Sequence, residues 1–185
     1  KNENLKKKIK NLKDSFMEYY GLSEEQAKKA IEVYRERFAP IGVLENQIFP
    51  GIPQLLKKLQ KSGTHLAVAS SKPAVFVHQI LRHFDIEKYF EVIVGSELDG
   101  TRGSKEEVVE EALRQLDIMT VEVNDRKACC AMIGDRKFDM QGAVAHGLTG
   151  GGVRFGFAVE GELEAAGADY IAETIEDLGR ILIEV

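Results

Sequence analysis

Residues Lys127–Ala143 read K-A-C-C-A-M-I-G-D-R-K-F-D-M-Q-G-A, and this stretch decides the fold that we expect. Ala128 to Ile133 is an unbroken apolar run, and its length is typical of a strand buried on both faces of a sheet. Gly134 ends the run, and the residues after it have the apolar spacing of a helix. A strand, a tight turn and a helix in this order predict a unit of a parallel α/β sheet.

Two carboxylates follow this strand. Asp135 stands at its carboxyl end, where open α/β sheets bind ligands, and Asp139 lies in the first turn of the helix. Together they offer the oxygen ligands that Mg²⁺ prefers, so both are candidate metal ligands. The alternative is structural, because the helix dipole favours Asp in a first turn and Gly-Asp is a common turn. These residues alone leave both interpretations open.

The chain changes character at Pro50. Before it the apolar spacing is helical, and Ser23 opens a capping box for a helix that runs to about Phe38. After it strands and helices alternate, which predicts a parallel sheet. We therefore expect a helical cap segment over residues 1–46 and an α/β core over residues 47–185. The strands expected in the core are His65–Ala69, Tyr89–Val94, Ala128–Ile133, Thr149–Val153 and Tyr170–Ile171.

Composition and charge argue against several classes of function. The 185 residues are 44% hydrophobic and 30% charged, which indicates one ordinary domain with a small appendage. The formal net charge of −5 argues against a dedicated nucleic-acid binder. Lys1–Lys13 is rich in lysine without interleaved aromatic residues, which favours a solvated helix over a nucleic-acid arm. No apolar run approaches the ~20 residues of a membrane span and no secretory signal is evident, so we expect a cytoplasmic protein without membrane partners.

Three features resemble functional motifs, but their chemistry does not match. Cys129 and Cys130 are neighbours in the expected strand and would point to opposite faces, which favours packing over a disulfide or a metal site. Glu97–Thr101 resembles the D-x-D-G-T motif of aspartate-based phosphatases, but its first acid is Glu and we interpret it as a polar turn. Gly150–Gly152 lacks the lysine and hydroxyl of a phosphate loop.

Two serines follow the expected strand His65–Ala69 at its carboxyl end. A hydroxyl at Ser70 or Ser71, close to free backbone N–H groups, can bind a phosphate oxygen. The alternative is a helix N-cap before Lys72 and Pro73, and it is favoured when the serines are considered alone.

Lys105 is the strongest single candidate for anion binding. It follows the predicted N-cap Ser104 at the first helical position, where the helix dipole disfavours a cation. Such a lysine suggests an anion in front of it, although Glu106 and Glu107 can also offset the cost. We expect Lys105 to contribute more to anion binding than to the stability of the fold.

These motifs occur in a known order: Ser70 after a strand, Lys105 at a helix start, and Gly134-Asp135-x-x-x-Asp139 after another strand. In this combination the chain resembles the haloacid dehalogenase (HAD) superfamily of phosphatases, most of all members of the phosphoglycolate phosphatase type. The local sequences F-P-G-I-P-Q-L-L-K-K-L before the first strand and A-S-S-K-P at its end agree with this resemblance. The resemblance extends from about Lys13 onward. It implies an α/β fold, with a HAD-like Rossmannoid parallel sheet, helices on both faces and a small helical cap.

The resemblance also implies a role for each candidate. A serine binds the transferring phosphoryl group, a lysine neutralises its charge, one Asp ligates Mg²⁺ while a second supports the metal shell, and a cap arginine lies where substrates are screened. The candidates are Ser70 and Lys105 for catalysis, Ser71 and Arg35 for substrate binding, and Asp135 and Asp139 for the metal.

One part of the family pattern has no counterpart in these residues. Members of the family begin with a strand ending in D-x-D, whose first Asp attacks phosphorus, and no D-x-D occurs here. Because that strand is the centre of the family's sheet, we expect a gap between the strands that end at Ala69 and Ile133, with unpaired edges.

The resemblance therefore implies a Mg²⁺-dependent phosphatase of small phosphorylated metabolites such as phosphoglycolate. It would act through an aspartyl-phosphate whose nucleophile is absent from these residues. The alternative is a non-catalytic protein that binds phosphate and metal, and a purely structural domain is a third interpretation. The exact substrate and the oligomeric state stay open.

Overall fold

The computed structural model of the chain describes residues 12–184. It divides into two compact units, and the boundary lies between Gln47 and Ile48. The first unit contains α1 (Leu12–Tyr20), α2 (Glu24–Phe38) and a short 3-10 turn, Gly42–Leu44. The predicted capping box is confirmed, because the Ser23 hydroxyl accepts from the Gln26 N–H and the Gln26 side chain accepts from the Ser23 N–H. Most of the lysine-rich segment Lys1–Lys13 lies outside the described residues.

The second unit is an α/β fold, as predicted, and all its described strand pairs are parallel. The strands are β1 (Ala67–Pro73), β2 (Val92–Ser96), β3 (Ala131–Gly134), β4 (Thr149–Val153) and β5 (Tyr170–Ala172). The helices are α3 (Ile52–Lys61), α4 (Ala74–His83), α5 (Lys105–Gln115), α6 (Val123–Cys129), α7 (Lys137–His146), α8 (Glu162–Ala165) and α9 (Ile175–Glu184), with 3-10 turns at Glu87–Tyr89 and Ile118–Thr120.

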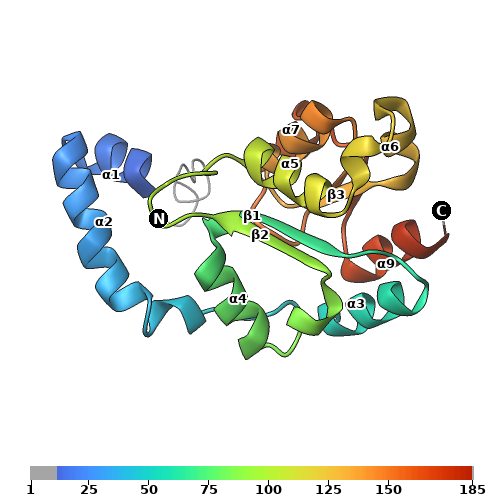
Figure 1. The fold of residues 1–185 in the computed structure, drawn as a ribbon, viewed down its shortest axis with the longest axis horizontal. Coiled ribbons are helices and arrows are strands. Elements are labelled where there is room, and N and C mark those ends of the chain that lie inside the picture. Colours follow the sequence, from blue (N-terminus) through green and yellow to red (C-terminus); the bar gives the residue numbers. More distant parts are fainter. Residues whose placement is uncertain (1–11, 185) are drawn as a thin grey trace. The chain divides into compact units, whose positions relative to one another are not determined.

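Helices cover both faces of the strands in this unit. In Figure 1, α5, α6 and α7 lie on one side of β1 and β2, and α3, α4 and α9 lie on the other. Helix α5 packs against β1 and β2, whereas α7 packs against β3 and β4. On the opposite side, α9 packs against β5 and against α3. This layering places the carboxyl ends of β1 and β3 beside the starts of α5 and α7.

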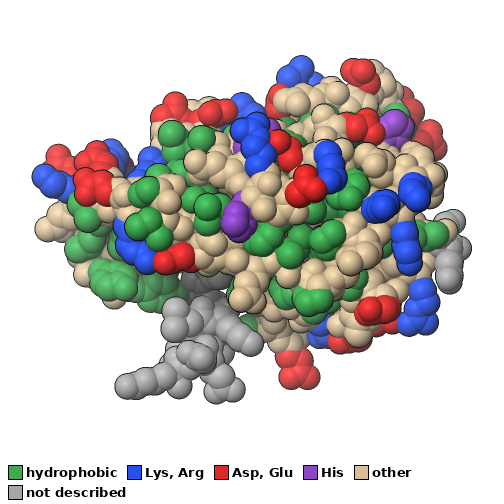
Figure 2. Space-filling model, turned by 90° about the horizontal axis from the view of Figure 1, so that it is seen from below, with side chains coloured by type: hydrophobic (Ala, Val, Ile, Leu, Met, Phe, Trp, Pro, Cys, Tyr) green, Lys and Arg blue, Asp and Glu red, His purple; other side chains and the backbone are tan. Residues whose placement is uncertain are grey.

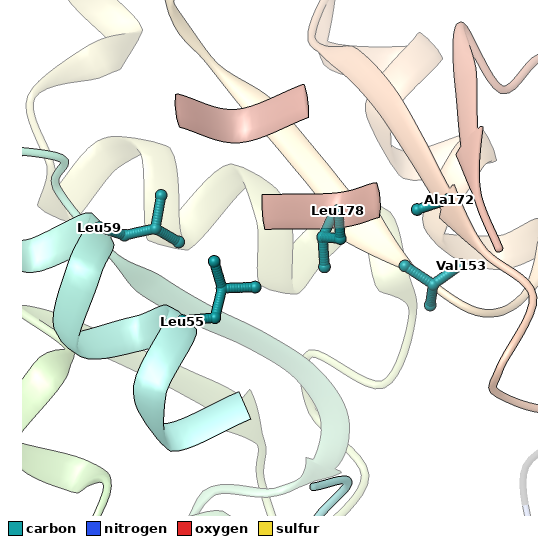
Figure 3. Close-up of a cluster of buried hydrophobic side chains, with 5 residues drawn as sticks. All are labelled: Leu55, Leu59, Val153, Ala172 and Leu178. Atoms are coloured by element: carbon teal, nitrogen blue, oxygen red, sulfur yellow. The ribbon is translucent and has the colours of Figure 1, made fainter. Parts of the chain in front are cut away.

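Apolar side chains from both sides fix these layers. One cluster joins α3 and α9 to the ends of β4 and β5, and Figure 3 shows its members facing one another. On the other side a second cluster joins α5 to α7. Their buried members are Leu55, Leu59, Val153, Ala172 and Leu178 in the first, and Val109, Leu113, Ala143 and Leu148 in the second. Burial of large apolar side chains stabilises a fold by about 1.5–3 kcal/mol each.

The described strands form two sheets. The order is β1-β2 in one and β3-β4-β5 in the other, so β1 and β3 do not pair with each other. Nevertheless both contribute to the second cluster, since Ala69 of β1 and Met132 of β3 pack against it. This agrees with the gap expected between them, and within residues 12–184 no strand pairs with both.

The strand predicted at Ala128–Ile133 begins later than expected. Ala128 and Cys129 end helix α6, and β3 starts only at Ala131. The buried Arg126 anchors this helix, because its guanidinium donates to the carbonyl oxygens of Val121 and Met119 at 2.9 Å each. An apolar run alone does not distinguish a strand from a helix end. The prediction that this strand is buried on both faces was also wrong, since Ala131 is exposed and the rest of β3 is half-buried.

The side chains of Cys129 and Cys130 consequently do not point to opposite faces of a strand, as was expected. Cys129 is exposed and Cys130 half-buried, and their sulfur atoms lie 3.5 Å apart instead of on opposite faces. The helix-to-strand change between them turns both side chains to one side. Burial, with the hydrogen bond to Cys129, raises the pKa of the Cys130 thiol to about 11, so the thiol stays protonated at neutral pH.

The surface carries charges of both signs. On the face seen in Figure 2, basic and acidic side chains are interspersed with hydrophobic ones. Within residues 12–184, none of the helices has the length and apolar character required to span a membrane.

Candidate active site

Ser70 and Ser71 lie in the irregular end of β1, not beyond the strand. The pairing of β1 with β2 shifts register between Ala69 and Pro73. The Ser70 hydroxyl accepts a hydrogen bond from the Lys72 N–H at 3.2 Å. Neither serine caps α4, because the N-cap of that helix is Pro73 and no side chain bonds there. The structural alternative for these serines was therefore wrong, and the Ser70 hydroxyl proton remains available to a ligand oxygen.

Lys105 is the first residue of α5, and its ammonium group is enclosed by the protein. Its Nζ lies 2.9 Å from Oδ1 of Asp139 and donates to the carbonyl oxygen of Ala69 at 2.8 Å. The side chains of Lys105 and Asp139 are only 16% and 10% exposed. The capping box of Ser104 and Glu107 fixes this helix start, as predicted. The anion that the position of Lys105 indicated is thus Asp139.

This contact brings two of the candidates together. Because Lys105 holds the carbonyl oxygen of Ala69, its ammonium lies beside the adjacent residue Ser70 at the end of β1. An ammonium has three N–H donors, and the contacts to Ala69 and Asp139 use two of them within the described part of the chain. The third can bind one phosphoryl oxygen.

Asp139 is buried, with 7% of its surface exposed. Its Oδ2 accepts from the Arg136 N–H at 3.0 Å, which closes the first turn of α7. The carboxylate lies directly on Gly134, where a Cβ atom would overlap it, so only glycine fits at that position. Both carboxylate oxygens are therefore engaged, Oδ1 by Lys105 and Oδ2 by this backbone donor.

Asp135 follows β3 directly and is half-buried. Its Oδ2 accepts from the main-chain N–H of Phe157 at 2.8 Å. This bond leaves Oδ1 and further lone pairs for other partners. The two carboxylates of the predicted metal site therefore differ in their partners. Asp139 is paired with the ammonium of Lys105, whereas Asp135 accepts a hydrogen bond from a main-chain N–H.

The Asp135 carboxylate is a suitable ligand for Mg²⁺, whereas Asp139 is paired with Lys105. Mg²⁺ at phosphoryl-transfer sites is usually held by one or two carboxylates, with waters and substrate phosphate oxygens filling the remaining positions. Within residues 12–184 no group of three or more His, Cys, Asp or Glu side chains is arranged to hold a metal. A single carboxylate with a free oxygen at the carboxyl end of a strand suits a metal shared with a phosphorylated ligand.

Arg35 belongs to the first unit, in helix α2. It is half-buried, and its carbonyl oxygen accepts from the Ala39 N–H at 2.9 Å. It belongs to a different compact unit from the other candidates, and its role in screening substrates stays a prediction. Ser71 is exposed, and its carbonyl oxygen accepts from the buried hydroxyl of Ser96 at 2.9 Å.

Sequence reasoning missed Ser96, Arg136 and Glu162. Arg136 pairs with Glu162 through its Nε at 2.8 Å, and the two side chains are 11% and 9% exposed. Burial by itself would raise the pKa of Glu162, but hydrogen bonds from the Lys137 N–H, Arg136 and the Val159 N–H lower it overall. No motif marks Glu162 in the sequence, because its partners lie about 25 residues earlier and meet it only in the folded chain.

The Glu97–Thr101 segment is a turn, as predicted. The Glu97 N–H donates to the carbonyl oxygen of Thr101 at 2.8 Å, and the Thr101 N–H donates to Oδ1 of Asp99 at 2.8 Å. Strand β2 extends to Ser96, so Glu97 follows a strand more closely than expected.

Comparison with known proteins agrees with this geometry. The sequence model described as haloacid dehalogenase-like hydrolase matches residues 1–153. A 5'-nucleotidase of Pseudomonas aeruginosa is 41% identical over 167 residues, which cover 90% of this chain and 72% of that protein. The crystal structure of a predicted phosphatase from Clostridium acetobutylicum is 44% identical, with a TM-score of 0.85 over 94% of this chain and 77% of that one.

Other relatives carry different names. The tyrosine-protein kinase PtkA of Mycobacterium tuberculosis is 38% identical over 164 residues, which cover 88% of this chain. The chain spans only about half of that protein, 54% of its length. Phosphoglycolate phosphatase of Colwellia psychrerythraea is 24% identical over 85% of this chain and 66% of that protein.

Proposed function

The chain belongs to the haloacid dehalogenase-like hydrolase family, and from this premise we propose that the protein is a Mg²⁺-dependent phosphatase of small phosphorylated metabolites. Its class, a phosphomonoester hydrolase, agrees with relatives named 5'-nucleotidase and phosphoglycolate phosphatase. The observation that carries the proposal is the enclosed ammonium of Lys105, beside Ser70 and held by Asp139. A cytoplasmic location is part of the proposal.

Each residue has a defined task in the proposed reaction. The Ser70 hydroxyl donates to one oxygen of the transferring phosphoryl group, and the third N–H of Lys105 donates to another. Asp139 orients the Lys105 ammonium through their ion pair, while Asp135 ligates the metal. When bound, Mg²⁺ supplies positive charge to the phosphoryl oxygens. Such positioning and charge neutralisation are the main contributions of a protein to phosphoryl transfer.

The substrate we propose is a phosphomonoester of a small metabolite. Phosphoglycolate fits the sequence resemblance, and a 5'-nucleotide fits the name of the relative that is 41% identical. Both present the same dianionic phosphate to Ser70 and Lys105, so these residues do not choose between them. The choice belongs to the cap segment and to Arg35.

The second candidate function is non-catalytic binding of phosphate and metal. The observation that favours it is the absence of D-x-D from these 185 residues, since the remaining candidates bind a phosphoryl group without attacking it. This alternative predicts the same ligand binding without turnover.

A titration with Mg²⁺ tests the metal assignment. We expect Asp135→Asn to weaken Mg²⁺ binding at least about tenfold, because a neutral amide replaces the charged ligand. The measurement is isothermal calorimetry in the presence of inorganic phosphate. Asp125→Asn, the same change on the exposed surface of α6, is the matched control and should bind as the wild type does. Equal affinity in the Asp135→Asn variant would remove Asp135 from the site.

A further inference from the structure

The loop that follows β4 contacts the candidate metal ligand although no motif marks it. We propose that this loop, through Gly156 and the main-chain N–H of Phe157, positions the Asp135 carboxylate for the metal. The inference rests on the proposed role of Asp135 and adds two positioning residues to it. Neither residue would touch the metal or the substrate through its side chain.

Two contacts join the loop to Asp135. The Phe157 N–H donates to Oδ2 of Asp135 at 2.8 Å. The main chain at Gly156 passes so close that a Cβ atom there would overlap the Cβ, Cγ and Oδ2 atoms of Asp135. The hydrogen bond fixes the rotation of the carboxylate, and the close approach blocks the volume on its loop side. The remaining oxygen, Oδ1, is left to face a ligand.

The loop is anchored where it leaves β4. The Arg154 N–H donates to the carbonyl oxygen of Ala172 at 3.0 Å, and its guanidinium pairs with Glu164 and, at 2.6 Å, with Glu173. The Phe155 ring packs edge-on against Phe49, with ring centroids 5.3 Å apart, and contributes to the cluster of Figure 3. Gly156 and Phe157 therefore follow two residues that are fixed to the core.

The loop is anchored again before α8. One oxygen of Glu162 accepts from Arg136 Nε at 2.8 Å and from the Lys137 N–H at 3.0 Å. Its other oxygen accepts from the Val159 N–H at 3.3 Å. A single buried carboxylate thus ties the loop to the start of α7, the helix that follows Asp135. The loop and the Asp135 carboxylate that it contacts are therefore both fixed relative to the start of α7.

This arrangement matters for metal affinity because an unsupported carboxylate loses rotational freedom on binding a cation. Groups that hydrogen-bond to a ligating side chain orient it in advance, and their removal typically lowers metal affinity about 10–100-fold. The Phe157 ring is 56% exposed, so changes at this position affect little core packing. The backbone donor can therefore be tested separately from the side chain.

The experiment compares two substitutions at one position. Phe157→Pro and Phe157→Ala both remove the ring, but only proline removes the N–H donor. Calorimetric titration with Mg²⁺ in the presence of inorganic phosphate should give Phe157→Ala an affinity close to wild type and Phe157→Pro an affinity about tenfold lower or weaker. Gly156→Ala should also lower the affinity, while Gly179→Ala in α9, where a Cβ makes only ordinary contacts, should not.

A second measurement does not depend on the folding of any variant. In the wild type, the Phe157 amide resonance should shift on titration with Mg²⁺, with the dissociation constant that calorimetry gives. Wild type that binds Mg²⁺ through Asp135, with an unmoved Phe157 amide or with equal affinities of Phe157→Pro and Phe157→Ala, overturns this inference alone. Wild type that fails to bind Mg²⁺ overturns the proposed metal role and this inference with it.

Discussion

At the scale of single residues, the site centres on the pair of Lys105 and Asp139. A lysine at the start of a helix opposes the dipole, and Asp139 offsets that cost from the start of α7. Removing one partner of a buried pair leaves the other charge uncompensated, which typically costs 3–5 kcal/mol. The structure therefore changes our expectation that Lys105 matters little for stability, because its charge satisfies a buried carboxylate.

A double-mutant cycle measures this pair. We expect Lys105→Met to lower the free energy of unfolding by about 3 kcal/mol at neutral pH, because it leaves Asp139 buried without a counter-charge. In Lys105→Met with Asp139→Asn, the loss should be smaller than the sum of the two single losses. Urea unfolding gives all the values. Strictly additive losses would show that the two side chains do not interact.

At the scale of elements, Glu162 joins two segments that carry the site. It receives hydrogen bonds from the start of α7 and from the loop after β4, and its pKa lies below the usual value of 4.5. A carboxylate whose pKa is lower in the folded chain stabilises the fold above its ordinary pKa, and this stabilisation is lost as the pH falls through the folded value.

The pH dependence of stability tests this junction. We expect Glu162→Gln to lower the free energy of unfolding by about 1–3 kcal/mol at neutral pH, because glutamine carries no charge for Arg136. The difference between wild type and Glu162→Gln should shrink as the pH falls from the ordinary value of 4.5 through the lower pKa of folded Glu162. Urea unfolding at several pH values measures it, with Glu160→Gln on the exposed loop as the control. A difference that does not change with pH would contradict the assignment.

At the scale of the whole molecule, the described strands form two sheets around a shared cluster. The strands β1 and β3 pack against one shared cluster without pairing, and unpaired strand edges readily accept a further strand. The candidates Ser70, Lys105 and Asp135 stand at the ends of the elements that border this gap. In the proposed function they bind and polarise a phosphoryl group, and none of them serves as the attacking nucleophile.

Turnover separates the phosphatase from the non-catalytic alternative. We expect a polypeptide of these 185 residues alone to release no phosphate from phosphoglycolate, a nucleoside 5'-monophosphate or an aryl phosphate, even with Mg²⁺. Loss of the attacking group of a covalent mechanism costs several orders of magnitude in rate. The same chain preceded by a strand ending in D-x-D should be active. If the 185 residues do release phosphate, and this activity disappears in Glu97→Gln or Asp99→Asn, then the Glu97–Thr101 turn is catalytic.

The sequence by itself determined the α/β class and the helices before Pro50, and it supplied the candidates for the site. These features depend on local rules: apolar periodicity gives the helices and strands, and a capping box gives the exact start of α5 at Lys105. The order of Ser70, Lys105, Asp135 and Asp139 gave the family because these residues follow strand ends and helix starts. The gap beside β1 was expected from the family resemblance instead, because the family's central strand has no counterpart in these residues.

Only the tertiary structure decided which contacts those residues make and where some of the elements begin. An apolar run has no marker for where α6 ends and β3 begins, since the anchoring of Arg126 to Val121 and Met119 depends on packing. Likewise, no local sequence pattern predicts that Asp139 contacts Lys105 and that Asp135 contacts Phe157. Those contacts join residues 34 and 22 positions apart in the chain, respectively, and they form only when the helices and loops pack on the strands.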